Sequence, residues 1–97
     1  MDESEALKLL QESREKIDEI DDEIMDLIAK RTSLATDIAR AKKILAKDIE
    51  DRKREDYIQH KIKEVAKEKQ INQASLTKIM KILTDLNKDE QEKILRR

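Results

Sequence analysis

A hydrophobic stripe with helical spacing runs through the first half of the chain. Apolar residues recur every three or four positions from about residue 5 to residue 45. The row taken at every seventh position reads Leu10, Ile17, Ile24, Arg31, Ile38 and Leu45. This period is typical of an amphipathic helix, and it predicts one long helix over about 5–45 that Asp2 or Ser4 caps at its start.

Two shorter stripes follow the long one. The helical pattern weakens between Ala46 and Asp51, which predicts a connection with Asp48 or Asp51 as the cap of the next helix. A second helix is predicted over about 51–69 and a third over about 73–95, with Asn72 as the N-cap of the third. The expected fold is therefore all-α, with three helices per chain in one domain over 1–97.

The length of the first helix predicts a partner for it. A helix of about 40 residues is about 60 Å long, whereas a compact domain of about 100 residues has a radius of gyration of about 13 Å. Two shorter helices cannot cover the apolar stripe of such a rod. We therefore expect a symmetric homodimer in which the long helices pair, with a plain antiparallel coiled coil as the competing interpretation.

Composition narrows the function classes. The 97 residues are 46% charged and contain no Gly, Pro or Cys, which argues against β-folds, glycine-rich phosphate loops, thiolate nucleophiles and cysteine-based metal sites. With one histidine, His60, no His-rich metal site is expected, and neither is a cofactor. The net charge of −1 disfavours a nucleic-acid partner. Short apolar runs and an acidic start predict no membrane segment and a cytoplasmic location.

Polar residues interrupt the stripes where the period demands apolar ones. They are Arg14, Arg31 and Lys42 in the first helix, Arg54 and Glu55 in the second, and Asn87 and Gln91 in the third. An inward-facing cation needs an anionic partner, because an unpaired buried charge costs several kcal/mol. Any one of them could be a snorkelling side chain or a residue that fixes register. Together they favour a polar cavity that binds an anion.

Spacing along the helix separates Arg14 from the other two cations. Arg31 and Lys42 are eleven residues apart, about 16 Å, so both can reach one small ligand. Arg14 and Arg31 are seventeen residues apart, about 25 Å, which is too far for a shared small ligand. If Arg14 binds ligand, we expect it to serve the cavity of a second protomer.

Five short motifs carry a resemblance to a known family. They are Arg14–Asp18, Ile28–Arg31, Ala39–Lys42, Asp51–Glu55 and Asn87–Gln91. In this order and spacing, over about residues 7–95, the chain resembles the all-helical (AroQ-type) chorismate mutases. The resemblance implies an intertwined homodimer of three-helix chains that converts chorismate to prephenate on the route to phenylalanine and tyrosine.

The resemblance also implies roles for individual residues. Arg14 of the other chain and Arg31 would bind the substrate's carboxylates, and Asn87 would hydrogen-bond a carboxylate. Lys42 and Gln91 would interact with the ether oxygen of the breaking bond. The rearrangement is pericyclic and unimolecular, so it requires no nucleophile, general base, metal or cofactor, and a dianionic substrate suits an arginine-lined cavity.

The ring hydroxyl would be held at the start of the second helix. Glu55 and the backbone at Asp51 would bind it, and Arg54 would support that end of the cavity. The chain departs from the family at Asn87, where serine is common, and it lacks the proline that many members have before Asp51. The alternatives are an isochorismate-pyruvate lyase, against which Glu55 argues, and a non-catalytic helical-bundle interaction protein.

Overall fold

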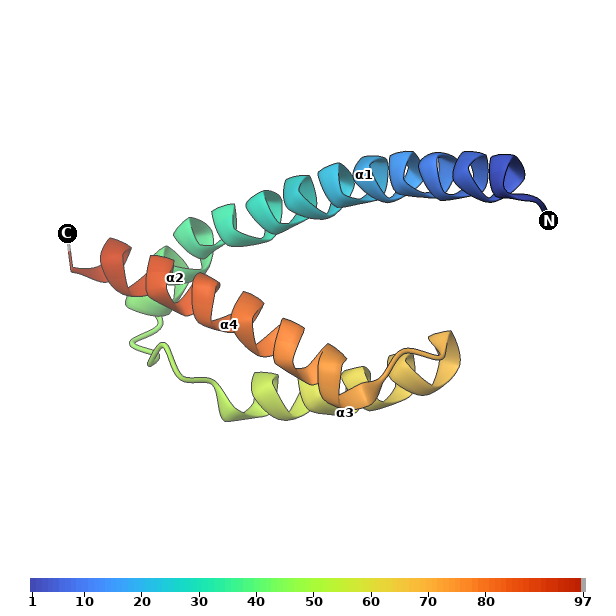
Figure 1. Cartoon of the computed structure of the whole chain (residues 1–97). Helices are drawn as coiled ribbons and strands as arrows, with labels where there is room; N and C mark the ends of the chain where they lie inside the picture. The colour runs from blue at the N-terminus through green and yellow to red at the C-terminus, as the bar shows by residue number, and fades with distance from the viewer. Residues whose placement is uncertain (97) are drawn as a thin grey trace. The chain divides into compact units, whose positions relative to one another are not determined.

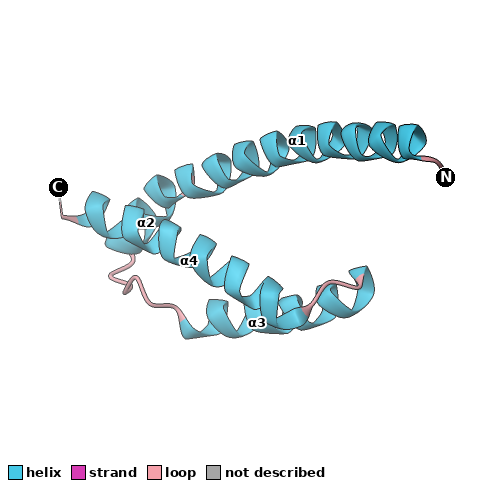
Figure 2. Ribbon diagram, in the orientation of Figure 1, coloured by secondary structure: helices cyan, strands magenta, loops and turns pink. Residues whose placement is uncertain are grey.

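The computed structural model describes residues 1–96, and all of the regular structure in that range is helical (Figure 2). The helices are α1 (Glu3–Ser33), α2 (Ala35–Ile44), α3 (Arg52–Lys69) and α4 (Gln73–Leu95) (Figure 1). The predicted all-α class is confirmed, and the long N-terminal helix is present. The chain divides into two compact units, Met1–Lys30 and Arg31 onward, so α1 crosses the boundary between them.

The structure divides the predicted first helix at Leu34. The backbone angles of Leu34, φ −67° and ψ −14°, are still those of a right-handed helix. Its carbonyl accepts a hydrogen bond from the Ile38 N–H at 3.1 Å. Thr32 and Ser33, directly before it, are weaker helix formers than the residues of the preceding turns. The result is a pair of helices separated by one residue where the period predicts a single helix.

Local hydrogen bonds explain where the helices begin. The Asp2 carboxylate accepts from the Glu5 N–H at 2.8 Å, and the Asp51 carboxylate accepts from the Arg54 N–H at 3.0 Å. The Asn72 side chain accepts from the Ser75 N–H at 2.9 Å. Each satisfies one of the free N–H groups of a first turn, so three residues that sequence analysis names as candidate caps are caps.

The end of α3 uses an unusual residue. Gln70 takes the left-handed conformation, with φ 55° and ψ 45°, and its N–H donates to the Ala66 carbonyl. Glycine is the residue that most often occupies this position after a helix. The chain contains no glycine, so Gln70 ends the helix instead. Its left-handed conformation is sterically unfavourable for a residue with a side chain.

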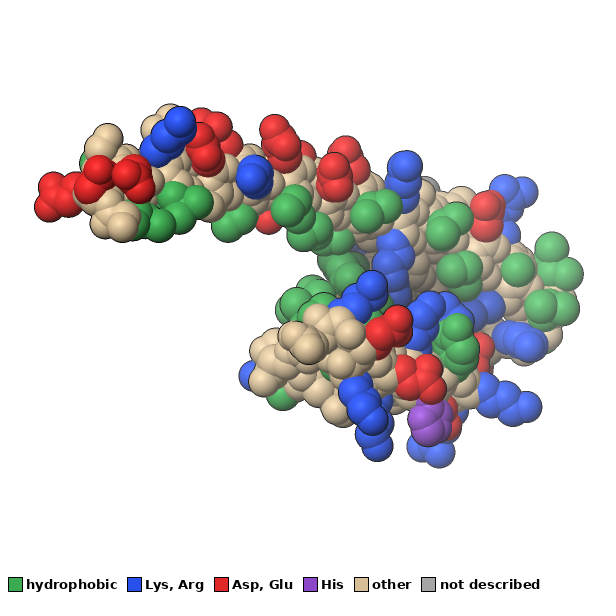
Figure 3. Space-filling model, turned by 90° about the vertical axis from the view of Figure 1, so that its right-hand side faces the viewer, with side chains coloured by type: hydrophobic (Ala, Val, Ile, Leu, Met, Phe, Trp, Pro, Cys, Tyr) green, Lys and Arg blue, Asp and Glu red, His purple; other side chains and the backbone are tan. Residues whose placement is uncertain are grey.

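The first unit, residues 1–30, is a single helical segment with an uncovered hydrophobic side. No residue of α1 is buried, and Leu10, Ile17 and Ile24 are 47%, 54% and 48% exposed. Hydrophobic side chains lie along one side of this helix, and charged side chains lie along the other (Figure 3). The amphipathic pattern is therefore present without a surface that covers it.

The second unit is built around α4, which packs against both α2 and α3 (Figure 1). Its apolar core is small and consists of Ala35, Ala39, Ile62 and Ala66. The two alanines of α2 are fully covered, and such short side chains let α4 approach closely. On the α4 side the buried residues are polar, Asn87 and Gln91, and this polar layer positions the candidate site.

None of the helices within residues 1–96 combines the length and the apolar character needed to cross a membrane.

Candidate active site

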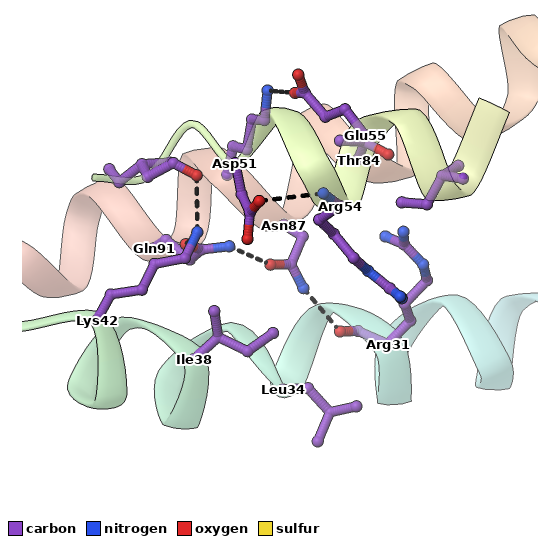
Figure 4. Close-up of a pocket in the computed structure, with 13 residues that line it drawn as sticks. Arg31, Leu34, Ile38, Lys42, Asp51, Arg54, Glu55, Thr84, Asn87 and Gln91 are labelled. Carbon is purple, nitrogen blue, oxygen red and sulfur yellow. Dashed lines mark hydrogen bonds and ion pairs between the residues drawn. The ribbon is translucent and has the colours of Figure 1, made fainter. Parts of the chain in front are cut away.

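A cavity of about 370 Å³ lies within the second unit. This is a size typical of small-molecule sites. The end of α1, together with α2, α3, α4 and the connection before α3, supplies its walls (Figure 4). Its lining includes the Thr84 hydroxyl and the charged and amide side chains of Arg31, Lys42, Asp51, Arg54, Glu55, Asn87, Lys88 and Gln91. Seven of the eight candidate residues from the sequence are therefore brought together, and Lys88 is added to them.

Lys42 joins the connection before α3 to α4 across the cavity. Its ammonium donates to the Ile49 carbonyl at 2.7 Å and to Gln91 Oε1 at 2.9 Å (Figure 4). A lysine ammonium has three N–H donors, so one of them is left for a ligand. The two acceptors fix the position of the charge without neutralising it, because neither of them is a carboxylate.

A chain of hydrogen bonds continues from Gln91 to the end of α1. Gln91 Nε2 donates to Asn87 Oδ1 at 2.7 Å, and Asn87 Nδ2 donates to the Arg31 carbonyl at 3.0 Å. The Arg31 guanidinium donates in turn to the Leu83 carbonyl at 2.7 Å. The Gln91 and Asn87 side chains are only 5% and 9% exposed. Their hydrogen bonds to protein groups therefore take the place of hydrogen bonds to water. The arrangement holds amide and cationic groups in fixed positions.

The first turn of α3 presents Arg54 and Glu55 to the cavity. Asp51 caps this turn, and its carbonyl accepts from the Glu55 N–H at 2.9 Å. The Arg54 guanidinium lies 5.0 Å from the centre of the Tyr57 ring, a cation–π geometry that orients the arginine. The helix cap therefore sets the direction in which both side chains point.

Lys88 is the charged site residue that sequence analysis missed. Its ammonium is hydrogen-bonded to the Glu55 carboxylate and lies 2.8 Å from Glu50 Oε1. These two carboxylates raise the pKa of Lys88, and its ammonium lowers the pKa of Glu50. The signal was available, because Lys88 precedes Gln91 by three residues and so lies on the same side of α4.

The charged groups of the cavity leave a positive balance. The cations are Arg31, Lys42, Arg54 and Lys88, and the carboxylates are Asp51 and Glu55. Glu50, which does not line the cavity, also pairs with Lys88. With Glu50 counted, one positive charge remains in excess, which favours an anionic ligand. No buried side-chain nitrogen or oxygen in the described part of the chain lacks a hydrogen-bond partner, so the buried amides of Asn87 and Gln91 are held in place before a ligand arrives.

Arg14 is the candidate residue that this cavity does not contain. It lies in the first unit, is exposed, and lines a shallow hollow with its neighbours on the same helix, Leu10 and Asp18 among them. Its guanidinium makes no hydrogen bond or ion pair within residues 1–96. In that same range, no group of three or more potential metal-ligating His, Cys, Asp or Glu side chains is found.

Comparison with known proteins identifies the family. The family described as chorismate mutase type II matches residues 13–92. A protein of Methanocaldococcus jannaschii named chorismate mutase is 43% identical over 89 residues, which cover 92% of this chain and 90% of that protein. No solved structure matches the chain. The extent of the family match and the identity to this relative show that the chain belongs to the chorismate mutase type II family.

Proposed function

We propose that this chain is a chorismate mutase, an isomerase that converts chorismate to prephenate in the cavity lined by Arg31, Lys42 and Gln91. The observation that carries the proposal is the pairing of Lys42 and Gln91 at 2.9 Å on the wall of a cavity with excess positive charge. A cation and an amide donor together are suited to a reaction in which negative charge develops on one oxygen.

The rearrangement itself requires positioning and electrostatics. The ether C–O bond of chorismate breaks while a C–C bond forms, and negative charge grows on the ether oxygen in the transition state. The third N–H of Lys42 and the second N–H of the Gln91 amide are the donors for this oxygen, because their other bonds are already made within the protein. Losing one such donor costs about 10²–10³-fold in rate in comparable sites.

The remaining cavity residues hold the substrate in its reactive, compact conformation. The Arg31 guanidinium binds one carboxylate, and the second N–H of the Asn87 amide hydrogen-bonds a carboxylate. At the other end, Glu55 and the backbone at Asp51 bind the ring hydroxyl, and Arg54 supports that end of the cavity. Fixing the reacting atoms in this way lowers the entropic part of the barrier.

The second substrate carboxylate requires a further cation, which we assign to Arg14 of a second chain. In this proposal two chains form a homodimer through the hydrophobic side of residues 1–30, where Leu10, Ile17 and Ile24 are about half exposed in the single chain. Pairing would bury this side, and the exposed Arg14 guanidinium would complete the partner's cavity. Two equivalent cavities per dimer follow from the symmetry.

The test is an assay of chorismate consumption. The reaction is monitored through the loss of chorismate's ultraviolet absorbance, and the product is identified as prephenate. We expect Lys42→Ala to lower kcat by about 10²–10³-fold. Lys43→Ala is the matched control, because Lys43 is the next residue on α2 and is exposed. We expect it to retain wild-type activity.

Two other outcomes would overturn the proposal. Release of pyruvate from isochorismate, with no prephenate from chorismate, would make the chain a lyase. No reaction with either substrate would favour a non-catalytic helical bundle whose cations serve only its own packing.

A further inference from the structure

Lys88 connects three segments of the second unit at the edge of the cavity. It projects from α4, contacts Glu55 of α3, and contacts Glu50 of the connection between α2 and α3. The side chain of Lys88 is 22% exposed and that of Glu55 is 35% exposed, whereas that of Glu50 is 70% exposed. The ammonium is thus held between a cavity carboxylate on one side and a surface carboxylate on the other.

We propose that Lys88 is a positioning residue, which orients the Glu55 carboxylate toward the substrate's ring hydroxyl and fastens the connection before α3 over the cavity. This inference rests on the proposed function, because it deepens the role of Glu55 in the same site.

The geometry at Glu55 supports the first part of this role. Lys88 contacts Glu55 through Oε1, which ties this carboxylate of α3 to α4. A carboxylate anchored through one oxygen retains the other as an acceptor in a defined direction. Without Lys88, the side chain of Glu55 would be free to change rotamer, and the proposed hydroxyl contact would be made only part of the time.

The charge arrangement around Lys88 argues against a direct role in substrate binding. Glu50 and Glu55 both contact the one ammonium, and they keep it protonated by raising its pKa. Its charge is therefore balanced by protein carboxylates, whereas Lys42 has only neutral acceptors. Lys88 also pairs with two like charges at once, and removing it would leave Glu50 and Glu55 close together without a cation.

The connection before α3 supports the second part of the role. Ile49 and Asp51 line the cavity, and Glu50 lies between them. Lys42 holds Ile49 through its carbonyl at 2.7 Å, and Lys88 holds Glu50 through its carboxylate at 2.8 Å. Two lysines from different helices thus fix consecutive residues of this segment, and Asp51 follows directly as the cap of α3.

The test is a double-mutant cycle between Lys88 and Glu55, read out as kcat and KM for chorismate. Lys88→Met should lower kcat/KM by about 10-fold, mainly through KM, because the hydroxyl contact is made in ground state and transition state alike. Lys88→Arg should recover most of this loss. In a Glu55→Ala background, Lys88→Met should lower kcat/KM by less than about threefold more. The larger part of its effect acts through the missing Glu55 carboxylate, and only the contact with Glu50 is left to lose.

Controls separate positioning from folding. Lys93→Met is the matched control, because Lys93 lies on the same helix, is exposed, and pairs with Glu90 at 3.1 Å. Thermal unfolding of each variant identifies any that fail to fold, and Lys88→Arg keeps the test decisive if Lys88→Met is one of them. An active wild type with additive losses at Lys88 and Glu55, or with an unchanged Lys88→Met, would overturn the role of Lys88 alone. A wild type that leaves chorismate unchanged would overturn the proposed function and this role with it.

Discussion

Residues 1–30 and residues 31–96 carry the same kind of amphipathic pattern and use it differently. In the second region, Ala35, Ala39 and Ile62 are at most 4% exposed, and they bring α4 close to α2 and α3. In the first region, Ile17 and Ile24 lie on the apolar side of α1 and are about half exposed. A hydrophobic stripe therefore predicts a helix from the sequence, but whether its own chain covers it depends on the rest of the fold.

The same contrast holds for the cations. Arg31 and Lys42 each hydrogen-bond to backbone carbonyls and lie on the wall of a cavity, whereas Arg14 makes no hydrogen bond or ion pair within residues 1–96. One region builds the binding site, and the other presents an uncovered face with a cation on it. Under the proposed function, the two regions of different chains are complementary.

The largest expected effect comes from substitutions on the uncovered hydrophobic side of residues 1–30. The double substitution Ile17→Asp with Ile24→Asp should convert the proposed dimer to a monomer, because each buried isoleucine contributes about 1.5–3 kcal/mol and each aspartate adds a desolvation cost. Sedimentation velocity measures the change, and chorismate turnover should fall by about 10²-fold or more with it. Lys16→Glu, on the charged side of the helix, is the control. A double variant that stays dimeric would contradict the role of this face.

The next effect concerns the buried amides of the second region. Asn87→Leu should lower the free energy of unfolding by about 1–3 kcal/mol, because it leaves the Arg31 carbonyl and Gln91 Nε2 without their partner. Urea unfolding measures this change. Asp89→Asn, at an exposed position on the same helix, should be neutral. An equally stable Asn87→Leu would show that the hydrogen-bond chain does not hold this region together.

The smallest expected effect concerns the backbone of the second region. Gln70→Gly should raise the free energy of unfolding by about 0.5–1 kcal/mol, because Gln70 has φ 55° and glycine adopts this conformation without the steric cost. Its greater freedom in the unfolded chain offsets part of the gain. Thermal unfolding should show an increase of a few degrees. A decrease would indicate that the glutamine side chain contributes more to this turn than its backbone costs.

Seven of the candidate residues named from the sequence line one cavity, and the signals that singled them out are local or periodic. Asp51 and Asn72 are caps, and capping depends on the next three residues alone. Lys42, Asn87 and Gln91 stood out as polar residues in apolar rows, and the structure places all three in the cavity.

The features that sequence analysis missed depend on tertiary contacts. The spacing to Gln91 places Lys88 on the cavity side of α4, but its partners, Glu50 and Glu55, are 38 and 33 residues away in the chain and cannot be predicted from that spacing. The division at Leu34 has only a weak signal in Thr32 and Ser33, since leucine is a good helix former and its backbone angles stay helical. The homodimer stays a prediction, because an amphipathic stripe shows a need for burial and does not specify its partner.

The central claim is that the cavity of residues 31–96 is completed by Arg14 of another chain, and mixing two impaired variants tests it directly. Arg14→Ala and Lys42→Ala should each lower kcat/KM by at least about 10-fold. When the two are unfolded together and refolded in equal amounts, half of the dimers pair one chain of each kind. Each such dimer has one cavity with both residues intact, so activity should recover to about a quarter of the wild-type value. A mixture that is no more active than its two components would contradict the claim, because it would place Arg14 in the cavity of its own chain or outside the site altogether.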